Sequence, residues 1–359
     1  MSWPATLETA NEQRPAPRPV RKKLRKRRPR DYSQPVRWTV QILFAALNVW
    51  IGVEFYLFVR HYETAGESVY VPRPAGIEGW LPIASLMGLK QWLLTGAVPH
   101  VHPAGIFILL AFLAISFLLR KSFCSWLCPV GTLSEWLWRA GRRIFRRNFR
   151  LPRWADLPLR SLKYILLGLF LYVIAKMPVE GIRAFMEGPY GLISDVKMLN
   201  FFRFLSATAA VTLGVLAVLS IFYQNFWCLY LCPYGALVGL VARFSPARIR
   251  RDPAVCIDCE KCAKACPSLL PVDRLVTVRS VECTGCLECV AVCPAEGALD
   301  LTAMLPRRRK IPYWAMAAGI AVLFVGIVGY AKAAGYWQTH LPSQVYQELV
   351  PRAHEFAHP

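Results

Sequence analysis

Apolar residues gather in five long stretches, separated by polar and basic segments. These stretches are Trp38–Val59, Pro103–Leu119, Leu162–Met177, Ser206–Tyr223 and Pro312–Ala331. A helix that crosses a bilayer needs about 20 mostly apolar residues, or about 17 at the short end. The pattern therefore predicts an α-helical integral membrane protein with about five transmembrane helices.

A sixth apolar stretch, residues 76–96, reads GIEGWLPIASLMGLKQWLLTG. Pro82 and the interior glycines favour a re-entrant or interfacial element over a full span. Counting this stretch as a crossing would also place the two cysteine motifs described below on opposite faces of the membrane. We therefore predict that it does not cross.

Composition agrees with a membrane protein, since 55% of the 359 residues are hydrophobic. The formal net charge of +21 comes largely from basic blocks at residues 17–30, 139–150, 243–251 and 307–310. Each block flanks an apolar stretch, as the positive-inside rule expects of cytoplasmic ends. Contact with anionic lipid explains the first block more simply than nucleic-acid binding does, so no nucleic acid is expected as a partner. The N-terminus is predicted to be cytoplasmic, without a cleavable signal peptide, and the C-terminus to lie across the membrane.

One cysteine motif is written twice, as FCSWLCPVG (123–131) and WCLYLCPYG (227–235). Each copy follows an apolar stretch, which predicts a duplicated hairpin with both motifs at the cytoplasmic mouth of the membrane. Facing each other, the pairs Cys124/Cys128 and Cys228/Cys232 present four thiols, the number that an iron–sulfur cluster or tetrahedral zinc needs. Buried, unpaired thiols in a helix seam are the alternative. The duplication favours a metal centre shared by these four cysteines, in addition to the two clusters predicted from the remaining cysteines.

Eight further cysteines form two copies of C-x2-C-x2-C-x3-C-P, CIDCEKCAKACP (256–267) and CTGCLECVAVCP (283–294). Bacterial two-cluster ferredoxins use this spacing, in which the fourth cysteine of each run ligates the other cluster. The spacing predicts two [4Fe-4S] clusters, one held by Cys256, Cys259, Cys262 and Cys293, the other by Cys283, Cys286, Cys289 and Cys266. Zinc is the weaker alternative, because zinc sites rarely repeat four cysteines at this spacing. No cysteine is left over for a disulfide.

These features predict five regions. They are a basic cytoplasmic arm (1–37), a four-helix membrane domain with both CxxxCP motifs (38–242), a ferredoxin-like α+β domain (243–311), a fifth transmembrane helix (312–334) and a periplasmic tail (335–359).

On the opposite side of the predicted membrane, the candidate residues are weaker. His100 with His102, and His354 with His358, have spacings that suit a metal or a quinone hydrogen bond, although loop histidines are usually solvated. Glu54 lies within the first apolar stretch, where a carboxylate is either a proton acceptor for quinol or a group that reaches the interface.

The chain resembles the NosR/NapH-type membrane polyferredoxins, which include oxidase-assembly and dehalogenase-accessory ferredoxins. The resemblance begins near residue 36 and rests on the two CxxxCP motifs, the double ferredoxin signature, and the segments RPAGIEGWLPIASLM (73–87), HPAG (102–105) and GPYGLISD (188–195). It implies a protein of the bacterial cytoplasmic (inner) membrane that links quinone or a cytoplasmic donor to a periplasmic reductase or its maturation. A copper reductase and a redox-sensing regulator are the alternative functions.

The sequence departs from the NosR-like pattern in its N-terminal region. NosR-like proteins usually carry an extracytoplasmic flavin domain there, whereas this sequence has only the basic arm. The chain also has no CxxCH haem motif, GxGxxG or Walker loop. We therefore expect flavin or haem chemistry to come from a partner, either a flavin-bearing or a cytochrome subunit.

Overall fold

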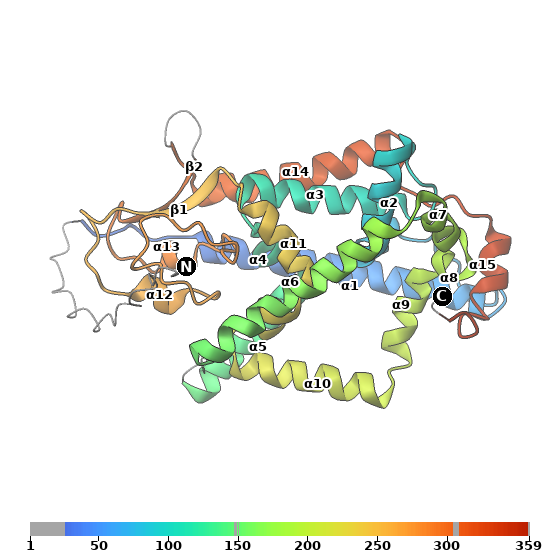
Figure 1. Ribbon diagram of the computed structural model, residues 1–359, viewed down its shortest axis with the longest axis horizontal. Coiled ribbons are helices and arrows are strands. Elements are labelled where there is room, and N and C mark those ends of the chain that lie inside the picture. Colours follow the sequence, from blue (N-terminus) through green and yellow to red (C-terminus); the bar gives the residue numbers. More distant parts are fainter. Residues whose placement is uncertain (1–25, 147–148, 150, 304–308, 358–359) are drawn as a thin grey trace, which may run out of the picture.

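The computed structural model describes residues 26–357 except 147, 148, 150 and 304–308. The basic arm up to residue 25 and His358 lie outside the described residues. Figure 1 shows the strands and the short helices α12 (Lys261–Ala265) and α13 (Glu288–Ala291) at one end of the long axis. The last helix, α15 (Ser343–Leu349), and the C-terminus lie at the other end.

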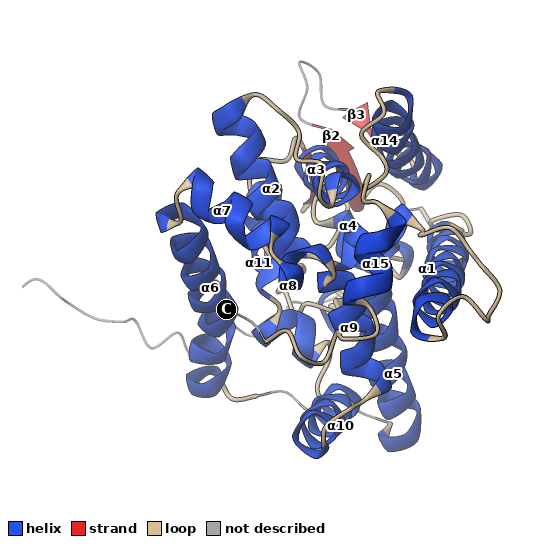
Figure 2. Ribbon diagram, turned by 90° about the vertical axis from the view of Figure 1, so that its right-hand side faces the viewer, coloured by secondary structure: helices blue, strands red, loops and turns tan. Residues whose placement is uncertain are grey.

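The five apolar stretches all form helices. They are α1 (Ser33–Glu63), α3 (Pro103–Leu119), α6 (Arg153–Lys176), α10 (Ala207–Phe222) and α14 (Tyr313–Ala333). Helices α1, α3, α10 and α14 run along the long axis and appear nearly end-on in Figure 2, whereas α6 is inclined to them. Helix α14 packs along α3, so the last apolar stretch closes against the second.

The count of five spans is not confirmed. Among the described residues, α1, α6 and α14 are long and apolar enough to cross a membrane by length and composition. Helix α3, with 17 residues, is too short to qualify. Helix α10 qualifies only together with α9 (Ser194–Arg203), from which it is bent by 79°.

The ambiguous stretch 76–96 divides into two short helices instead of one long one. A 3₁₀ helix, η1 (Ala75–Trp80), leads into α2 (Pro82–Thr95), which ends at Gly96 in the left-handed conformation. Proline at the first position of α2 and glycine at its end are the usual helix boundaries. Helix α2 packs on α3 and on α7 (Val179–Glu187).

The cysteine repeat folds in two closely related ways. After α3, the first motif forms α4 (Ser122–Trp126) and α5 (Pro129–Phe145); after α10, the second forms η2 (Trp227–Leu231) and α11 (Pro233–Ala242). The second copy, η2, is a π-helix, whereas α4 is an α-helix. Wide π turns occur often at functional sites, and here the backbone around Cys228 differs from that around Cys124.

The ferredoxin-like part contains a small antiparallel sheet in the order β1 (Ala247–Arg251), β2 (Leu299–Ala303) and β3 (Arg309–Lys310). Strands β1 and β2 pair with Ile249 opposite Leu301, and both side chains are buried. The same hydrophobic core includes Phe123 and Trp126 of the first motif and Met316 of α14. The cluster-binding part therefore shares one core with the helices.

A buried ionic network also fastens the ferredoxin-like part to the helices. Arg37 of α1 donates to both carboxylate oxygens of Glu135 on α5, at 2.6 and 2.7 Å, and to Glu288 of α13 at 3.1 Å. Burial by itself would raise the pKa of Glu135, but Arg37 and Arg139 lower it to about 2. Three elements that are distant in sequence are thus held by one guanidinium.

We predict that Arg37→Met destabilises the protein by about 1–3 kcal/mol, because the buried carboxylates of Glu135 and Glu288 lose one of their two cationic partners and keep only Arg139. The measurement is thermal unfolding in detergent. Lys264→Gln is the control, because it removes an exposed ion pair with Glu260. Equal melting temperatures for Arg37→Met and the wild type would contradict the prediction.

Candidate functional site

The twelve cysteines line three pockets. The first, called here the distal pocket, is lined by Cys256, Cys259, Cys262 and Cys293. These thiols belong to three cysteines of the first ferredoxin motif and the last cysteine of the second. The structure therefore brings together the four residues that the sequence assigns to one cluster, and their role as ligands stays a prediction.

The second hollow, the proximal pocket, is lined by Cys266, Cys283, Cys286 and Cys289. These are the four cysteines assigned to the other cluster. All four are buried, whereas the cysteines of the distal pocket are partly exposed. The proximal pocket is thus the one further from solvent.

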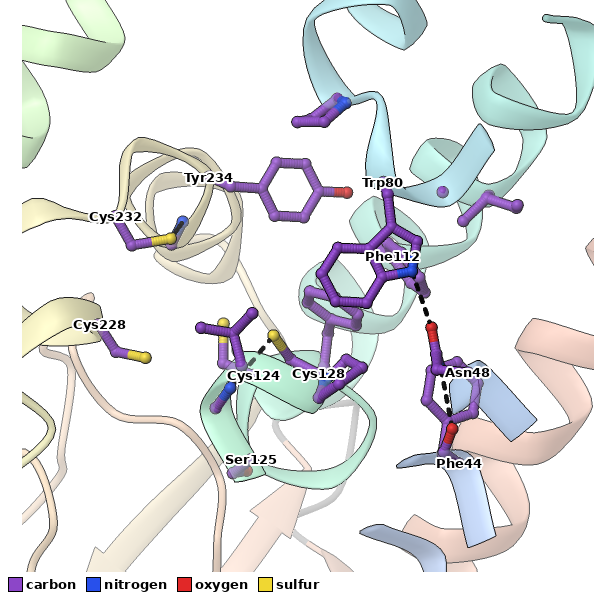
Figure 3. Close-up of a pocket in the computed structure, with 18 of the residues that line it drawn as sticks. Phe44, Asn48, Trp80, Phe112, Cys124, Ser125, Cys128, Cys228, Cys232 and Tyr234 are labelled. Carbon is purple, nitrogen blue, oxygen red and sulfur yellow. Dashed lines mark hydrogen bonds between the residues drawn. The ribbon is translucent and has the colours of Figure 1, made fainter. Parts of the chain in front are cut away.

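The third hollow, the membrane cavity, has a volume of about 540 Å³, and Cys124, Cys128, Cys228 and Cys232 all line it. Figure 3 shows the second pair facing the first across this space. The two motifs, a hundred residues apart in the chain, meet here as the duplicated hairpin predicts.

Both copies of the motif end in the same local structure. The sulfur of Cys128 accepts a hydrogen bond from the Gly131 amide at 3.4 Å, and that of Cys232 accepts one from the Gly235 amide at 3.2 Å. Each cysteine caps the helix that follows, with proline at the first helical position. Amide donors to sulfur stabilise the thiolate and tune the potential of a bound cluster.

The other end of the membrane cavity is apolar and aromatic. It is formed by side chains of α1, η1, α3 and α14, namely Phe44, Leu47, Ile51, Trp80, Ile108, Phe112, Phe324 and Val328. Polar groups are few here: the Trp80 indole donates to Asn48 at 3.0 Å, and the Tyr234 hydroxyl points into the cavity (Figure 3). A cavity with sulfur at one end and rings at the other suits an apolar molecule beside a metal centre.

The membrane cavity and the proximal pocket adjoin each other. Cys286, Pro267, Ser268 and Thr284 line both hollows. The first motif also bonds directly to the second ferredoxin loop, because the Ser125 hydroxyl donates to the Thr284 carbonyl at 2.7 Å and the Trp126 indole to the Gly285 carbonyl at 3.2 Å. Cys262 of the distal pocket lies within electrostatic range of Cys289 of the proximal pocket, so the three pockets follow one another in space.

The chemistry of these donors fits iron–sulfur clusters. Burial raises the pKa of Cys266 to about 11 and that of Cys286 to about 12, so these thiols stay protonated at neutral pH unless a cation replaces the proton. Burial likewise raises the pKa of Cys262, to about 12. In the described part of the chain, no three Cys, His, Asp or Glu side chains converge closely enough to hold a single metal ion.

A second polar site lies at the opposite end of the helices. Arg73 donates to Asp195 at 2.8 Å and to Glu78 at 2.8 Å, and all three side chains are largely buried. His102 contacts Arg73 at 3.2 Å, and Thr339 donates to Glu78 at 2.7 Å. This outer network joins the three short segments of the family resemblance to the C-terminal tail.

The weaker candidates do not share a site. His102 is buried in the outer network, whereas the His100 side chain is 59% exposed and lies 3.9 Å from Glu187. His354 is exposed on the C-terminal segment. Glu54 is half-buried on α1 and does not line the membrane cavity.

Sequence patterns did not identify several charged residues near the sites. Arg73 and Glu78 stand inside the segment RPAGIEGW, and a carboxylate within an apolar stretch was the available signal for Glu78. Lys121, Lys163 and Glu282 were also missed, although each is a charged residue beside apolar or cysteine-rich sequence, which is the same kind of signal.

Family models and curated relatives support 4Fe-4S binding and electron transport. A 4Fe-4S binding domain model matches residues 101–152 and 205–252, which include both CxxxCP motifs, and a 4Fe-4S dicluster domain model matches residues 248–307. The putative electron transport protein YccM of Escherichia coli is 47% identical over 91% of this chain and 94% of its own length. No solved structure matches the chain.

More distant relatives share part of the chain. The ferredoxin-type protein NapH of Escherichia coli is 25% identical over 59% of this chain and 72% of its own length. The regulatory protein NosR of Pseudomonas aeruginosa is 31% identical over 51% of this chain, which spans only 25% of that relative. With its two 4Fe-4S domains and its apolar helices, this chain belongs to the NosR/NapH-type membrane polyferredoxins, a family of iron–sulfur electron-transport proteins.

Proposed function

We propose that the chain conducts electrons between a membrane quinone and its ferredoxin-like part through three [4Fe-4S] clusters in series. The clusters sit in the membrane cavity, the proximal pocket and the distal pocket, each held by the four cysteines that line it. One observation carries the proposal: the membrane cavity has four thiols at one end, rings at the other, and shares Cys286 with the proximal pocket.

The apolar end of the membrane cavity suits the ring of an isoprenoid quinol, with Asn48, Trp80 and Tyr234 as the polar groups near its oxygens. Oxidation of a quinol releases two electrons and two protons, and clusters accept electrons singly. This chain's residues supply the binding surface, exclude water and fix the distance to the thiols. The clusters supply the redox chemistry.

The proposal includes an orientation in the bacterial inner membrane. The ferredoxin-like part and the basic blocks face the cytoplasm, and the outer network with the C-terminal tail faces the periplasm. These two parts lie at opposite ends of the long axis in Figure 1, which supports the orientation. The partner that we propose, a periplasmic redox enzyme system, is the one that the family resemblance implies.

We predict about twelve irons per chain after anaerobic purification, because three four-iron clusters are proposed. The double variant Cys124→Ala/Cys228→Ala should retain about eight and lose one cluster signal in electron paramagnetic resonance. Cys256→Ala is the comparison, because it should remove the signal of the distal pocket instead. About eight irons in both the wild type and the double variant would contradict the proposal of a third cluster.

Leu47→Trp tests the quinol site, since it fills the apolar end of the membrane cavity. The indole would occupy space that the quinol ring needs, so the affinity for a quinol analogue should fall by roughly tenfold, or about 1.4 kcal/mol. Reduction by dithionite should be unchanged. The control is Leu43→Trp, one turn away on α1, where the side chain is 65% exposed and does not line the cavity. Failure of quinol to reduce the wild-type clusters would exclude the proposed donor.

A further inference from the structure

A group of buried charges forms one wall of the membrane cavity. Glu282, which precedes Cys283, accepts a hydrogen bond from Lys163 of α6 at 2.6 Å and lies 3.5 Å from the ammonium of Lys121. The side chains of Lys121, Lys163 and Glu282 are 5%, 0% and 9% exposed. Lys121 and Glu282 line the cavity together with the four thiols of the repeat.

This wall carries more positive than negative charge. The ammonium groups of Lys121 and Lys163 face the single carboxylate of Glu282. The other hydrogen-bond partner of this carboxylate is the neutral Tyr164 hydroxyl, at 2.8 Å. Arg160, the next cation along α6, is already paired with Asp156 at 2.9 Å. A buried cation without a counter-charge is expensive, so the wall favours an anion inside the cavity.

The nearest groups that can supply this anion are the cysteines. The thiols of Cys124, Cys228 and Cys232 lie within electrostatic range of Lys121. Lys121 lies two residues after the end of α3 and three positions before Cys124, so the backbone fixes its place relative to Cys124. A four-iron cluster bound by four thiolates carries net negative charge, and each reduction adds one more negative charge.

We propose that the ammonium of Lys121, which shares the Glu282 carboxylate with Lys163, is the counter-charge of the cluster in the membrane cavity. This positive charge raises the reduction potential of that cluster. This inference rests on the proposed third cluster. A fixed positive charge stabilises the reduced, more negative form, whereas a carboxylate disfavours it. Lys121 is a positioning and tuning residue, and it makes this centre a better acceptor for electrons from quinol.

Potentiometric titration followed by electron paramagnetic resonance tests the sign of the effect. Lys121→Gln should lower the potential of this cluster and Glu282→Gln should raise it, each changing the reduction equilibrium by about tenfold, or about 59 mV for a one-electron couple. Lys121→Arg should keep the wild-type value. The cluster of the distal pocket serves as the internal reference, because it lies beyond the proximal pocket.

Lys90→Gln is the matched control, because the Lys90 ammonium is bound by the carbonyls of Ile174, Ala175 and Met177, away from the thiols. It should leave all potentials unchanged. Equal potentials in Lys121→Gln, Glu282→Gln and the wild type would overturn the inference while leaving the third cluster in place. A wild type that lacks the third signal would instead refute the proposed function on which the inference rests.

Discussion

The structure depends on the direct contact between the first cysteine motif and the second ferredoxin loop. Arg120, Ser125 and Trp126 donate hydrogen bonds to backbone carbonyls at Ser280, Thr284 and Gly285, and their neighbours share one buried core with the sheet. Electrons move between centres only over short distances, so a loosely tethered ferredoxin would break the path. Here the loop that lines the proximal pocket is also part of the wall of the membrane cavity.

Buried charge reinforces this contact on both sides. Arg37 binds Glu135 and Glu288 beside the proximal pocket, and the pair Lys121–Glu282 lines the membrane cavity. At the far end, Arg73, Glu78 and Asp195 hold the outer segments to the tail. Burial would raise the pKa of Glu78, yet Arg73 and His102 lower it to about 2, so this carboxylate stays ionised at neutral pH.

Much of this arrangement could be predicted from local sequence. Length and hydropathy indicated the helices, and the spacing of Cys256–Cys266 and Cys283–Cys293 indicated which thiols gather, because these features repeat over short distances in the chain. The charged contacts could not be predicted, since Arg37 and Glu288 or Lys163 and Glu282 are more than a hundred residues apart. The π-helical turn at Cys228 could not be predicted either, because both motifs share the same CxxxCP pattern. The span count and the domain limits stay predictions.

The central claim is that three four-iron centres lie in series from the membrane cavity to the distal pocket. An anomalous difference map, collected at the iron absorption edge from crystals grown without oxygen, tests it most directly. The account predicts three iron peaks, one of them between Cys124, Cys128, Cys228 and Cys232. Two peaks confined to the ferredoxin-like part, with an iron-free membrane cavity, would contradict it.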